Sequence, residues 1–438
     1  MTTLALSQSA TLQPAAPPTT GARKRQAIAL FQWLLAIYTA IVLTKFHELV
    51  PFMNRLQPAK LTGVLLLVLG FAVLHGRSVM RIVRTPPAVC ALLITVLAVL
   101  STPGSVWPGN SVIFLATIFW KTLLLFVISA TAWCDRPTLR LSLTVLVIGQ
   151  AAVAAAMVSG AAQAVMGRAY VGTAFDPNES AMQLLVVIPF ALYLAARGGV
   201  WRVLGLGSML LLVAGVVRTG SRGGFVGLAA LAIWMIVHVR PRRRRAMVAL
   251  GVAAAAVVVV VTASPATRER IGSILHPTED YNYSYREGRI QVWRRGIGYM
   301  LQRPVFGVGV QGFPVADGVL SGKKNEGYGI KYSAAHNMFV QIGAELGVLG
   351  LLVFLRMLWA AAAGSARVLL LSRRLRAPDE GHLAEAALGA FVAWLVGGFF
   401  LSVAYAPITF FVIAVCIAVR WGSPLPQLAR TTPPVAAT

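Results

Sequence analysis

The sequence predicts an all-α, polytopic membrane protein with about twelve transmembrane helices and one large outer loop that contains short helices. The first observation is composition: of 438 residues, 57% are hydrophobic, only 12% are charged, and the mean hydropathy is +0.74. The second is arrangement, because the apolar residues come in separate runs and each bilayer span needs roughly 20 mostly apolar residues. A water-soluble chain of this length would not carry so much apolar sequence.

The apolar runs define the candidate spans and, with them, the expected division of the chain. The runs cover residues 27–44, 61–75, 86–101, 111–131, 141–160, 181–195, 203–217, 224–239, 246–263, 338–359, 383–402 and 407–421. The expected division is an N-terminal tail in 1–26, nine spans in 27–263, the outer loop in 264–336, three spans in 337–421 and a C-terminal tail in 422–438.

Both tails are expected in the cytoplasm. The first is rich in Ser, Thr, Ala and Pro and ends in Arg23-Lys24-Arg25, and the following apolar run lacks a small-residue cleavage site, so we expect a retained first span. The tail after Trp421 is Pro-rich, which is typical of disorder. Lys and Arg are concentrated in alternate short connections, and the positive-inside rule then places both termini inside.

The net charge of +25 could suggest nucleic acid, but its distribution instead indicates membrane topology and an anionic lipid substrate, with no nucleic-acid partner. Cys90, Cys134 and Cys416 fall in or beside apolar runs and have no disulfide or metal-site spacing. The sequence has no evident repeat of 20–50 residues, which disfavours a secondary transporter or lipid flippase without excluding one.

The outer loop contains two patterns of its own. Ile290, Trp293, Ile297 and Leu301 recur at helical spacing, which predicts an amphipathic helix on the membrane surface with Arg289 near the headgroups. The run 307–312 matches GxGxxG, but no strand–turn–helix context surrounds it. We therefore interpret it as a turn-rich link and not as a dinucleotide site.

His336 is the first candidate for chemistry. It precedes Asn337 at the start of an apolar helix, and a helical projection puts Gly343, Gly347 and Gly350 beneath it, a smooth face for another helix or a lipid tail. A helix N-terminus disfavours the imidazolium form, which keeps the ring neutral as a general base must be. The alternative is a structural histidine bonded to a backbone carbonyl.

Arg218 and Arg222 flank an outer turn, Thr219-Gly220-Ser221, and Gly223-Gly224 follow. A span begins here, so its free N–H groups face outward, and arginine at a helix N-terminus is suited to phosphate. Ordinary snorkelling of the arginines at the interface is the alternative.

Lys121 lies midway along its span, where a lysine is costly and suggests function. It could face a diphosphate, or it could pair with Glu345 in the tenth span. The few outer carboxylates form no DxD or ExD pair, so the sequence predicts no metal site and no cofactor.

Several of these residues together resemble a known family. His336-Asn337-x9-Gly347-x-x-Gly350 is similar to the signature of bacterial O-antigen ligases. Three stretches resemble the wider O-antigen ligase/polymerase family: Phe175-Asp176-Pro177-Asn178, Thr219-Gly220-Ser221-Arg222-Gly223, and Arg289-x3-Trp293 followed by 303–309. Residues 1–170 carry no matching motif.

The resemblance implies a GT-C-like glycosyltransferase of the bacterial inner membrane that acts in lipopolysaccharide biosynthesis. Its donor is a glycan on undecaprenyl diphosphate, and a ligase transfers that glycan to a sugar hydroxyl of lipid A–core on the periplasmic face. We expect His336 as base, Arg222 and Arg289 as catalytic, diphosphate-binding residues helped by Arg218 or Lys121, and supporting roles for Asn178, Trp293, Asn337 and Glu345. A polymerase or a protein O-oligosaccharyltransferase of the same family remains the alternative, and the large single loop favours the ligase.

Overall fold

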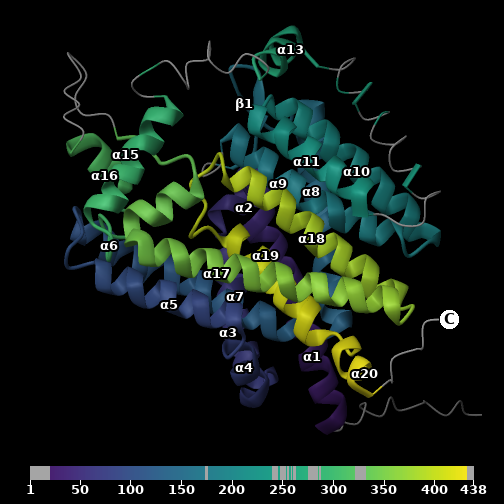
Figure 1. Ribbon diagram of the computed structural model, residues 1–438. Coiled ribbons are helices and arrows are strands. Elements are labelled where there is room, and N and C mark those ends of the chain that lie inside the picture. Colours follow the sequence, from purple (N-terminus) through teal and green to yellow (C-terminus); the bar gives the residue numbers. More distant parts are fainter. Residues whose placement is uncertain are drawn as a thin grey trace, which may run out of the picture.

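A computed structural model describes residues 20–172, 176–238, 245–246, 253, 256–257, 259, 263–274, 285, 288–320 and 332–431 of the chain (Figure 1). This part of the chain is helical apart from one two-stranded hairpin. Its elements are α1 (Thr20–Thr44), η1 (Phe46–Leu49), α2 (Pro51–Arg55), α3 (Pro58–Val73), α4 (Gly76–Val83), α5 (Pro86–Ser101), α6 (Pro108–Phe114), η2 (Leu115–Phe119), α7 (Trp120–Ala132), α8 (Arg136–Ser159), β1 (Gln163–Val165), β2 (Arg168–Tyr170), α9 (Pro177–Ala195), α10 (Gly199–Thr219), α11 (Arg222–His238), α13 (Pro265–Gly272), α15 (Arg289–Gln302), α16 (Phe313–Val319), α17 (Met338–Arg374), α18 (Pro378–Gly398), α19 (Pro407–Gly422) and α20 (Leu425–Thr431).

The described helices confirm an all-α, polytopic membrane protein. Seven stretches are long and apolar enough to cross a bilayer: most of α1, the continuous α6–η2–α7, and α8, α9, α10, α17 and α18. The α3–α4 pair, bent by 108°, would make an eighth, and α5, α11 and α19 are shorter apolar helices. The structure thus does not establish about twelve spans, and the predicted run 246–263 lies mostly outside the described residues.

Side-chain contacts show which helix ends lie together. Arg218, in the last turn of α10, donates to the carbonyl of Met157 near the end of α8. Gly223, at the start of α11, packs against Phe400 just after α18. The backbone N–H of His336, just before α17, donates to Ser402 Oγ between α18 and α19. We call this shared end of the bundle the His336 end.

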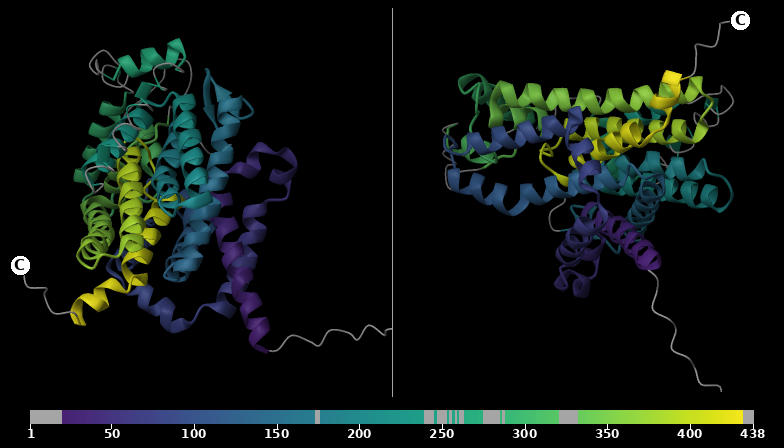
Figure 2. Two further views of the ribbon diagram at one scale, coloured as in Figure 1. Left: turned by 90° about the vertical axis from the view of Figure 1, so that its right-hand side faces the viewer. Right: turned by 90° about the horizontal axis from the view of Figure 1, so that it is seen from below.

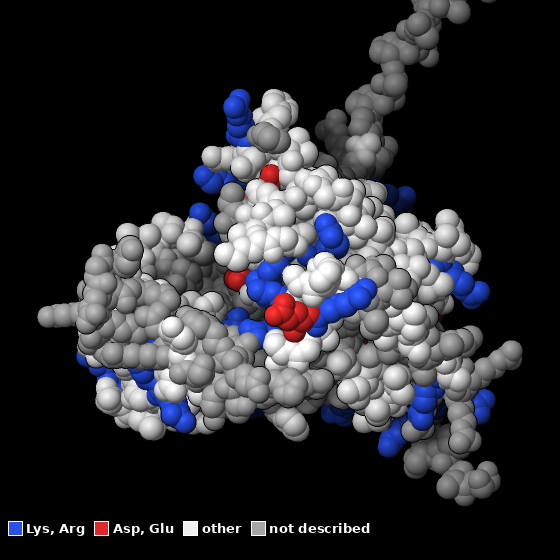
Figure 3. All heavy atoms as spheres, turned by 90° about the horizontal axis from the view of Figure 1, so that it is seen from above, with Lys and Arg blue, Asp and Glu red and all other residues white. Residues whose placement is uncertain are grey.

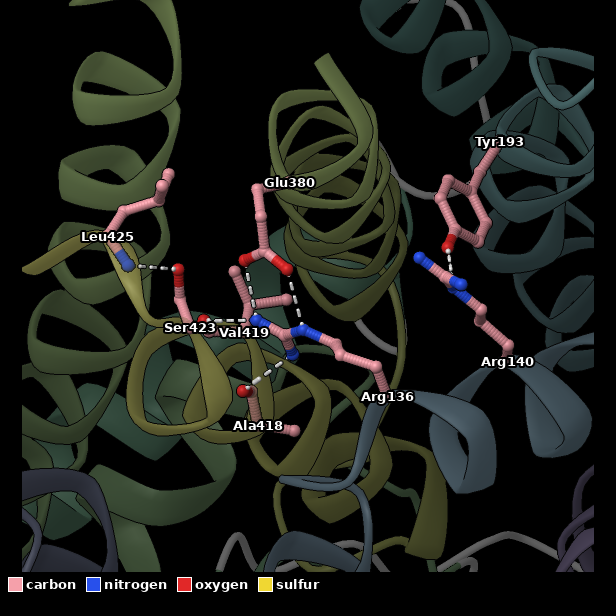
Figure 4. A network of polar contacts seen from close by, with 8 residues as sticks. All are labelled: Arg136, Arg140, Tyr193, Glu380, Ala418, Val419, Ser423 and Leu425. Atoms are coloured by element: carbon pink, nitrogen blue, oxygen red, sulfur yellow. Dashed lines mark hydrogen bonds and ion pairs between the residues drawn. The ribbon is translucent and has the colours of Figure 1, made fainter. Parts of the chain in front are cut away.

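The opposite ends of the same helices meet in a second polar network (Figure 4). Arg136, at the start of α8, makes a bidentate ion pair with Glu380 in α18, with distances of 2.8 and 2.7 Å. The same guanidinium donates to the carbonyls of Ala418 and Val419, which are C-terminal acceptors of α19. Figure 2 (left) shows the start of α1 and α20 at one end of the molecule. The network satisfies groups that α19 leaves unpaired at its end.

Helix α17 is broken at Gly347, whose φ of 71° and ψ of −172° are not helical. The break frees two carbonyls, and the segment after α15 uses them: Val308 N–H donates to Ala344 O, and Gly309 N–H donates to Glu345 O. The N–H of Val348 donates in turn to Pro304 O, 2.8 Å away. The run 304–309 is therefore inserted at the break in the helix. Its backbone N–H and C=O groups pair with the backbone groups of α17 that the break leaves unpaired.

This insertion corrects the prediction of a smooth glycine face. A Cβ at Gly347 would lie 2.2 Å from Pro304 O, and one at Gly343 would lie 2.7 Å from Met300 Sδ. Gly343 and Gly347 are needed where the segment 300–309 packs on α17, so these two glycines face that segment. The GxGxxG run is the turn-rich link that was predicted, with left-handed φ angles at Gly307 and Gly309.

The helix predicted near residue 290 exists as α15, and it packs on the protein through a face other than the predicted membrane face. Val292, Gly296 and Tyr299 are buried, whereas Ile297 and Leu301 are exposed. Gly296 permits the close contact, because a Cβ there would lie 2.3 Å from Val340 of α17. The helix is thus fixed against α17, and its contact with the membrane surface stays a prediction, as does the division of the chain into spans, loop and tails.

Candidate active site

His336 lies just outside α17, in a conformation that its neighbours stabilise. Asn337 is the N-cap of the helix, and its Oδ1 accepts from the N–H groups of Phe339 and Val340 at 2.9 and 3.1 Å. His336 itself has φ of 48°, a left-handed conformation that non-glycine residues rarely adopt. The projection that treated His336 as part of the helix was therefore wrong, because the regular helix begins two residues later.

Trp293 connects α15 to the chain directly before His336. Its indole N–H donates to the carbonyl of Ala335 at 3.0 Å, and its ring packs edge-on against Phe399 at 5.3 Å. Together with the bond from His336 N–H to Ser402 Oγ, this contact fixes the backbone on both sides of the imidazole. Trp293 and Asn337 thus position His336, while the ring itself is half-buried.

Burial and the nearby charges together favour the neutral form of the His336 ring. Burial is the largest influence and lowers the pKa of His336, and the Arg289 guanidinium lowers it further. The Asp176 carboxylate acts in the opposite direction. The lowered pKa agrees with the expectation of a neutral base. Its causes are burial and Arg289, whereas the sequence indicates the helix N-terminus as the cause.

The turn between α10 and α11 presents Arg222 at the first position of α11. Gly220 has φ of 56° and ends α10, and Ser221 Oγ accepts from the N–H of Gly224 at 3.1 Å. Arg222 donates to Ser273 Oγ at 3.2 Å, which connects the turn to the segment following α13. The glycines serve packing here, because a Cβ on Gly224 would meet Ala181 at 2.9 Å. The approach of an anion to this backbone stays a prediction.

Asn178 is the centre of a network that the sequence did not predict. Its Oδ1 accepts from Arg168 Nη2 at 2.8 Å and from Ser221 Oγ at 2.9 Å. Its Nδ2 donates to Asp176, the N-cap of α9, at 3.0 Å. The network therefore joins the β1–β2 hairpin, the start of α9 and the α10–α11 turn. Phe175, which belongs to the same sequence motif, lies outside the described residues.

Arg168 of this network lies within electrostatic range of three arginines from three other elements. Burial is the largest influence and lowers the pKa of Arg168, and repulsion from Arg270, Arg222 and Arg289 lowers it further, while Asp176 opposes them. Figure 3 looks down on this side of the molecule and shows Lys and Arg side chains gathered near its centre around a few acidic atoms. Such an excess of positive charge is suited to a multiply charged anion.

Three of the predicted site residues lie elsewhere. Arg218 Nε donates to the Met157 carbonyl at 3.3 Å, away from the turn. Lys121 is exposed on α7, with its ammonium 5.8 Å from the Trp120 ring centroid, and it is not among the charges that act on His336 or Arg168. Glu345 is 1% exposed, and no ion pair joins it to Lys121 in the described part of the chain.

Glu345 has a role in the inserted segment. Its Oε1 accepts from the N–H of Phe313 at 3.3 Å, at the start of α16. Its carbonyl accepts from Gly309, so side chain and backbone both hold the segment that follows α15. Within the described residues, no group of three His, Cys, Asp or Glu side chains is arranged to hold a metal ion.

Taken together, these features define a polytopic membrane protein with a cationic site and a neutral histidine at one end of its bundle. The family model for O-antigen ligase matches residues 207–355, which include Arg222, Arg289 and His336. The match covers less than half of the chain, and it supports a member of the O-antigen ligase family. Membership implies a glycosyltransferase-like enzyme that works with a glycan donor, an acceptor and membrane lipids. No curated protein sequence matched the chain.

Proposed function

We propose that this protein is an O-antigen ligase. It transfers a glycan from undecaprenyl diphosphate to a sugar hydroxyl of lipid A–core in lipopolysaccharide biosynthesis. One observation supports this most strongly: His336, with a lowered pKa, lies under the influence of Arg289, and Arg289 belongs to the same cluster as Arg222. A base beside a cationic site is what glycosyl transfer from a lipid diphosphate requires.

The reaction is a single displacement. The acceptor oxygen attacks the anomeric carbon while its proton passes to the neutral imidazole of His336. The bond between that carbon and the diphosphate oxygen breaks, and undecaprenyl diphosphate leaves with its additional negative charge neutralised by Arg222 and Arg289. Because attack and departure occur on opposite faces of the anomeric carbon, the reaction inverts its configuration.

The membrane orientation follows from charge at the two ends. Arginines also populate the end opposite His336, in Arg136, Arg140, Arg197, Arg202, Arg373, Arg374 and Arg420. By the positive-inside rule, that end and both termini face the cytoplasm. The His336 end then faces the periplasm of the bacterial inner membrane, where lipid-linked glycans and lipid A–core meet.

The test is transfer by purified protein in detergent or nanodiscs, supplied with undecaprenyl-diphosphate-linked O-antigen and lipid A–core. We expect acceptor carrying long glycan chains, seen as a ladder on gels. Donor glycans that lengthen without reaching the core would instead identify a polymerase. In a deletion strain, loss of all long chains on the core supports the ligase, whereas a core bearing one repeat unit supports the polymerase.

In that assay, Arg222→Ala and Arg289→Ala should each slow transfer on the order of 10²-fold at saturating donor, as expected when a group that stabilises developing charge is lost. Lysine at either position should restore only part of the rate, because it lacks the bidentate guanidinium. An alanine variant with the wild-type maximal rate would show that the arginine in question only anchors the donor.

A further inference from the structure

We propose that Arg168, on the β1–β2 hairpin, is a third, preorganised ligand for the diphosphate of the donor. The inference rests on the proposed function but reaches beyond the residues in the matched family region, which begins at residue 207. The hairpin is short, and its turn at Met166 and Gly167 has left-handed φ angles of 50° and 73°. Arg168 is the first residue after this turn, so its place is set by the hairpin register.

Two hydrogen bonds fix the guanidinium of Arg168. Its Nε donates to the carbonyl of Thr219 at 2.9 Å, and its Nη2 donates to Asn178 Oδ1 at 2.8 Å. The acceptors are themselves fixed: Thr219 is fully buried, and Asn178 is bonded to both Ser221 and Asp176. The plane of the guanidinium is therefore set before any ligand arrives, which lowers the entropy lost on binding.

The guanidinium retains capacity for a ligand. An arginine carries five N–H donors, and the hydrogen bonds among the described residues use two of those on Arg168. The remaining donors belong to Nη1 and to the second hydrogen of Nη2. Planar, paired N–H groups of this kind match two oxygens of a phosphate.

The surroundings of Arg168 indicate an anion. Arg222, Arg270 and Arg289 all repel its charge, and Asp176 is the carboxylate that opposes them. The mutual repulsion of these guanidinium groups is relieved when a multiply charged anion lies among them. A diphosphate carries several negative charges over two tetrahedral groups, so it can contact guanidinium groups from the hairpin, α11, α13 and α15 at once.

A purely structural role would make Arg168 only a clamp between the hairpin and the α10–α11 turn. The two roles differ in their consequences. A clamp alters stability and leaves anion affinity unchanged in protein that still folds, whereas a ligand alters anion affinity directly. Asn178→Asp separates them, because an aspartate keeps an acceptor for Arg168 and Ser221, gives up the donor to Asp176 and adds negative charge beside the site.

The experiment measures binding of inorganic pyrophosphate by calorimetry, together with the donor KM and kcat of the same purified variants. Arg168→Gln should bind pyrophosphate on the order of tenfold to a hundredfold more weakly, the cost of losing charge-assisted hydrogen bonds. Arg168→Lys should recover part of that loss, and Asn178→Asp should weaken binding while the protein stays folded. Arg197→Gln, an exposed arginine stacked on Trp201 beyond the end of α9, is the matched control and should bind like wild type.

Pyrophosphate affinity and donor KM unchanged in Arg168→Gln, with only a lower melting temperature, would overturn the proposal and leave Arg168 a clamp. Wild-type protein that does not bind pyrophosphate would overturn it as well. The proposed function is tested separately: if Arg168→Gln loses pyrophosphate binding while wild-type protein transfers no glycan, the anion site stands and the ligase reaction is wrong.

Discussion

The protonation of His336 depends on two charged neighbours that shift its pKa in opposite directions. Arg289 lowers the pKa and Asp176 raises it, and burial adds to the effect of Arg289. A base is active when deprotonated, so transfer should be lost as the pH falls through the pKa of His336. Because that pKa lies below its ordinary value, activity should persist to a lower pH than an exposed histidine would allow.

Substitutions of the two neighbours should therefore move the acid limb of the pH–rate profile in opposite directions. Arg289→Gln removes a cation, raises the pKa of His336 and should shift the limb to higher pH, on top of its lower rate. Asp176→Asn removes an anion, keeps an N-cap for α9, and should shift the limb to lower pH. The kcat/KM of each variant between about pH 4.5 and 8.5, a range of about two units either side of the ordinary histidine value, checks this. Limbs that coincide with wild type would mean that another group is the base.

At this scale, the sequence predicted some of the site. His336, Arg222 and Arg289 stood out because motifs and expected helix ends surround them. Arg168 and its partnership with Asn178 did not, because their contact joins a hairpin to a helix start and a distant turn. No ion pair joins Lys121 to Glu345 among the described residues, because hydropathy gives depth along a span but not the direction in which a side chain points.

Among the elements, the broken helix α17 determines how the outer segment attaches. Its first part begins at the Asn337 cap beside His336, and Gly347 interrupts the helix where the run 304–309 inserts. Periodicity could predict an apolar helix here, yet it assumes a regular one. Periodicity does not predict the positive φ of Gly347, and so the sequence alone indicates a smooth surface at the three glycines.

Gly347→Ala tests the insertion. The left-handed φ alone costs a non-glycine residue about 1–3 kcal/mol, and the new Cβ would lie 2.2 Å from Pro304 O. We expect a clearly lower melting temperature together with a large loss of transfer, since this segment follows α15 and holds to α17, whose cap lies beside His336. Gly207→Ala in α10, where a Cβ meets nothing within 4 Å, is the control and should be neutral or stabilising. Equal melting temperatures for both variants would contradict the account.

For the whole molecule, hydropathy predicts the architecture better than it predicts the place of any single site residue. Eleven of the predicted runs coincide with described helices, because a bilayer demands long apolar stretches and helical backbone. The number of spans was less predictable, since short helices such as α5 and α19 and the bent α3–α4 pair do not have the length of a simple span. The alternation of the spans predicts which helix ends lie on the same side. It does not predict which charged side chains lie together there.

Charge neutralisation by arginine has a consequence at the level of the whole enzyme. Transfer should survive a chelator such as EDTA, because guanidinium groups occupy the place where a divalent ion would neutralise the diphosphate. The measurement compares turnover by purified enzyme with and without chelator, using donor and acceptor stripped of metal. Turnover that disappears and returns with added Mg²⁺ or Mn²⁺ would mean that a metal ion does this work, with Asp176 or Glu179 as candidate ligands.

The most direct test of the central claim is the transfer rate of His336→Ala and His336→Asn. Asparagine tolerates the left-handed backbone of this position but cannot act as the base. His238→Asn is the matched control, since His238 stacks on Trp234 at the opposite end of the bundle. We predict that both His336 variants fold, insert and bind pyrophosphate yet transfer no glycan, while His238→Asn works normally. Near-normal transfer by well-folded His336→Asn protein would contradict the account.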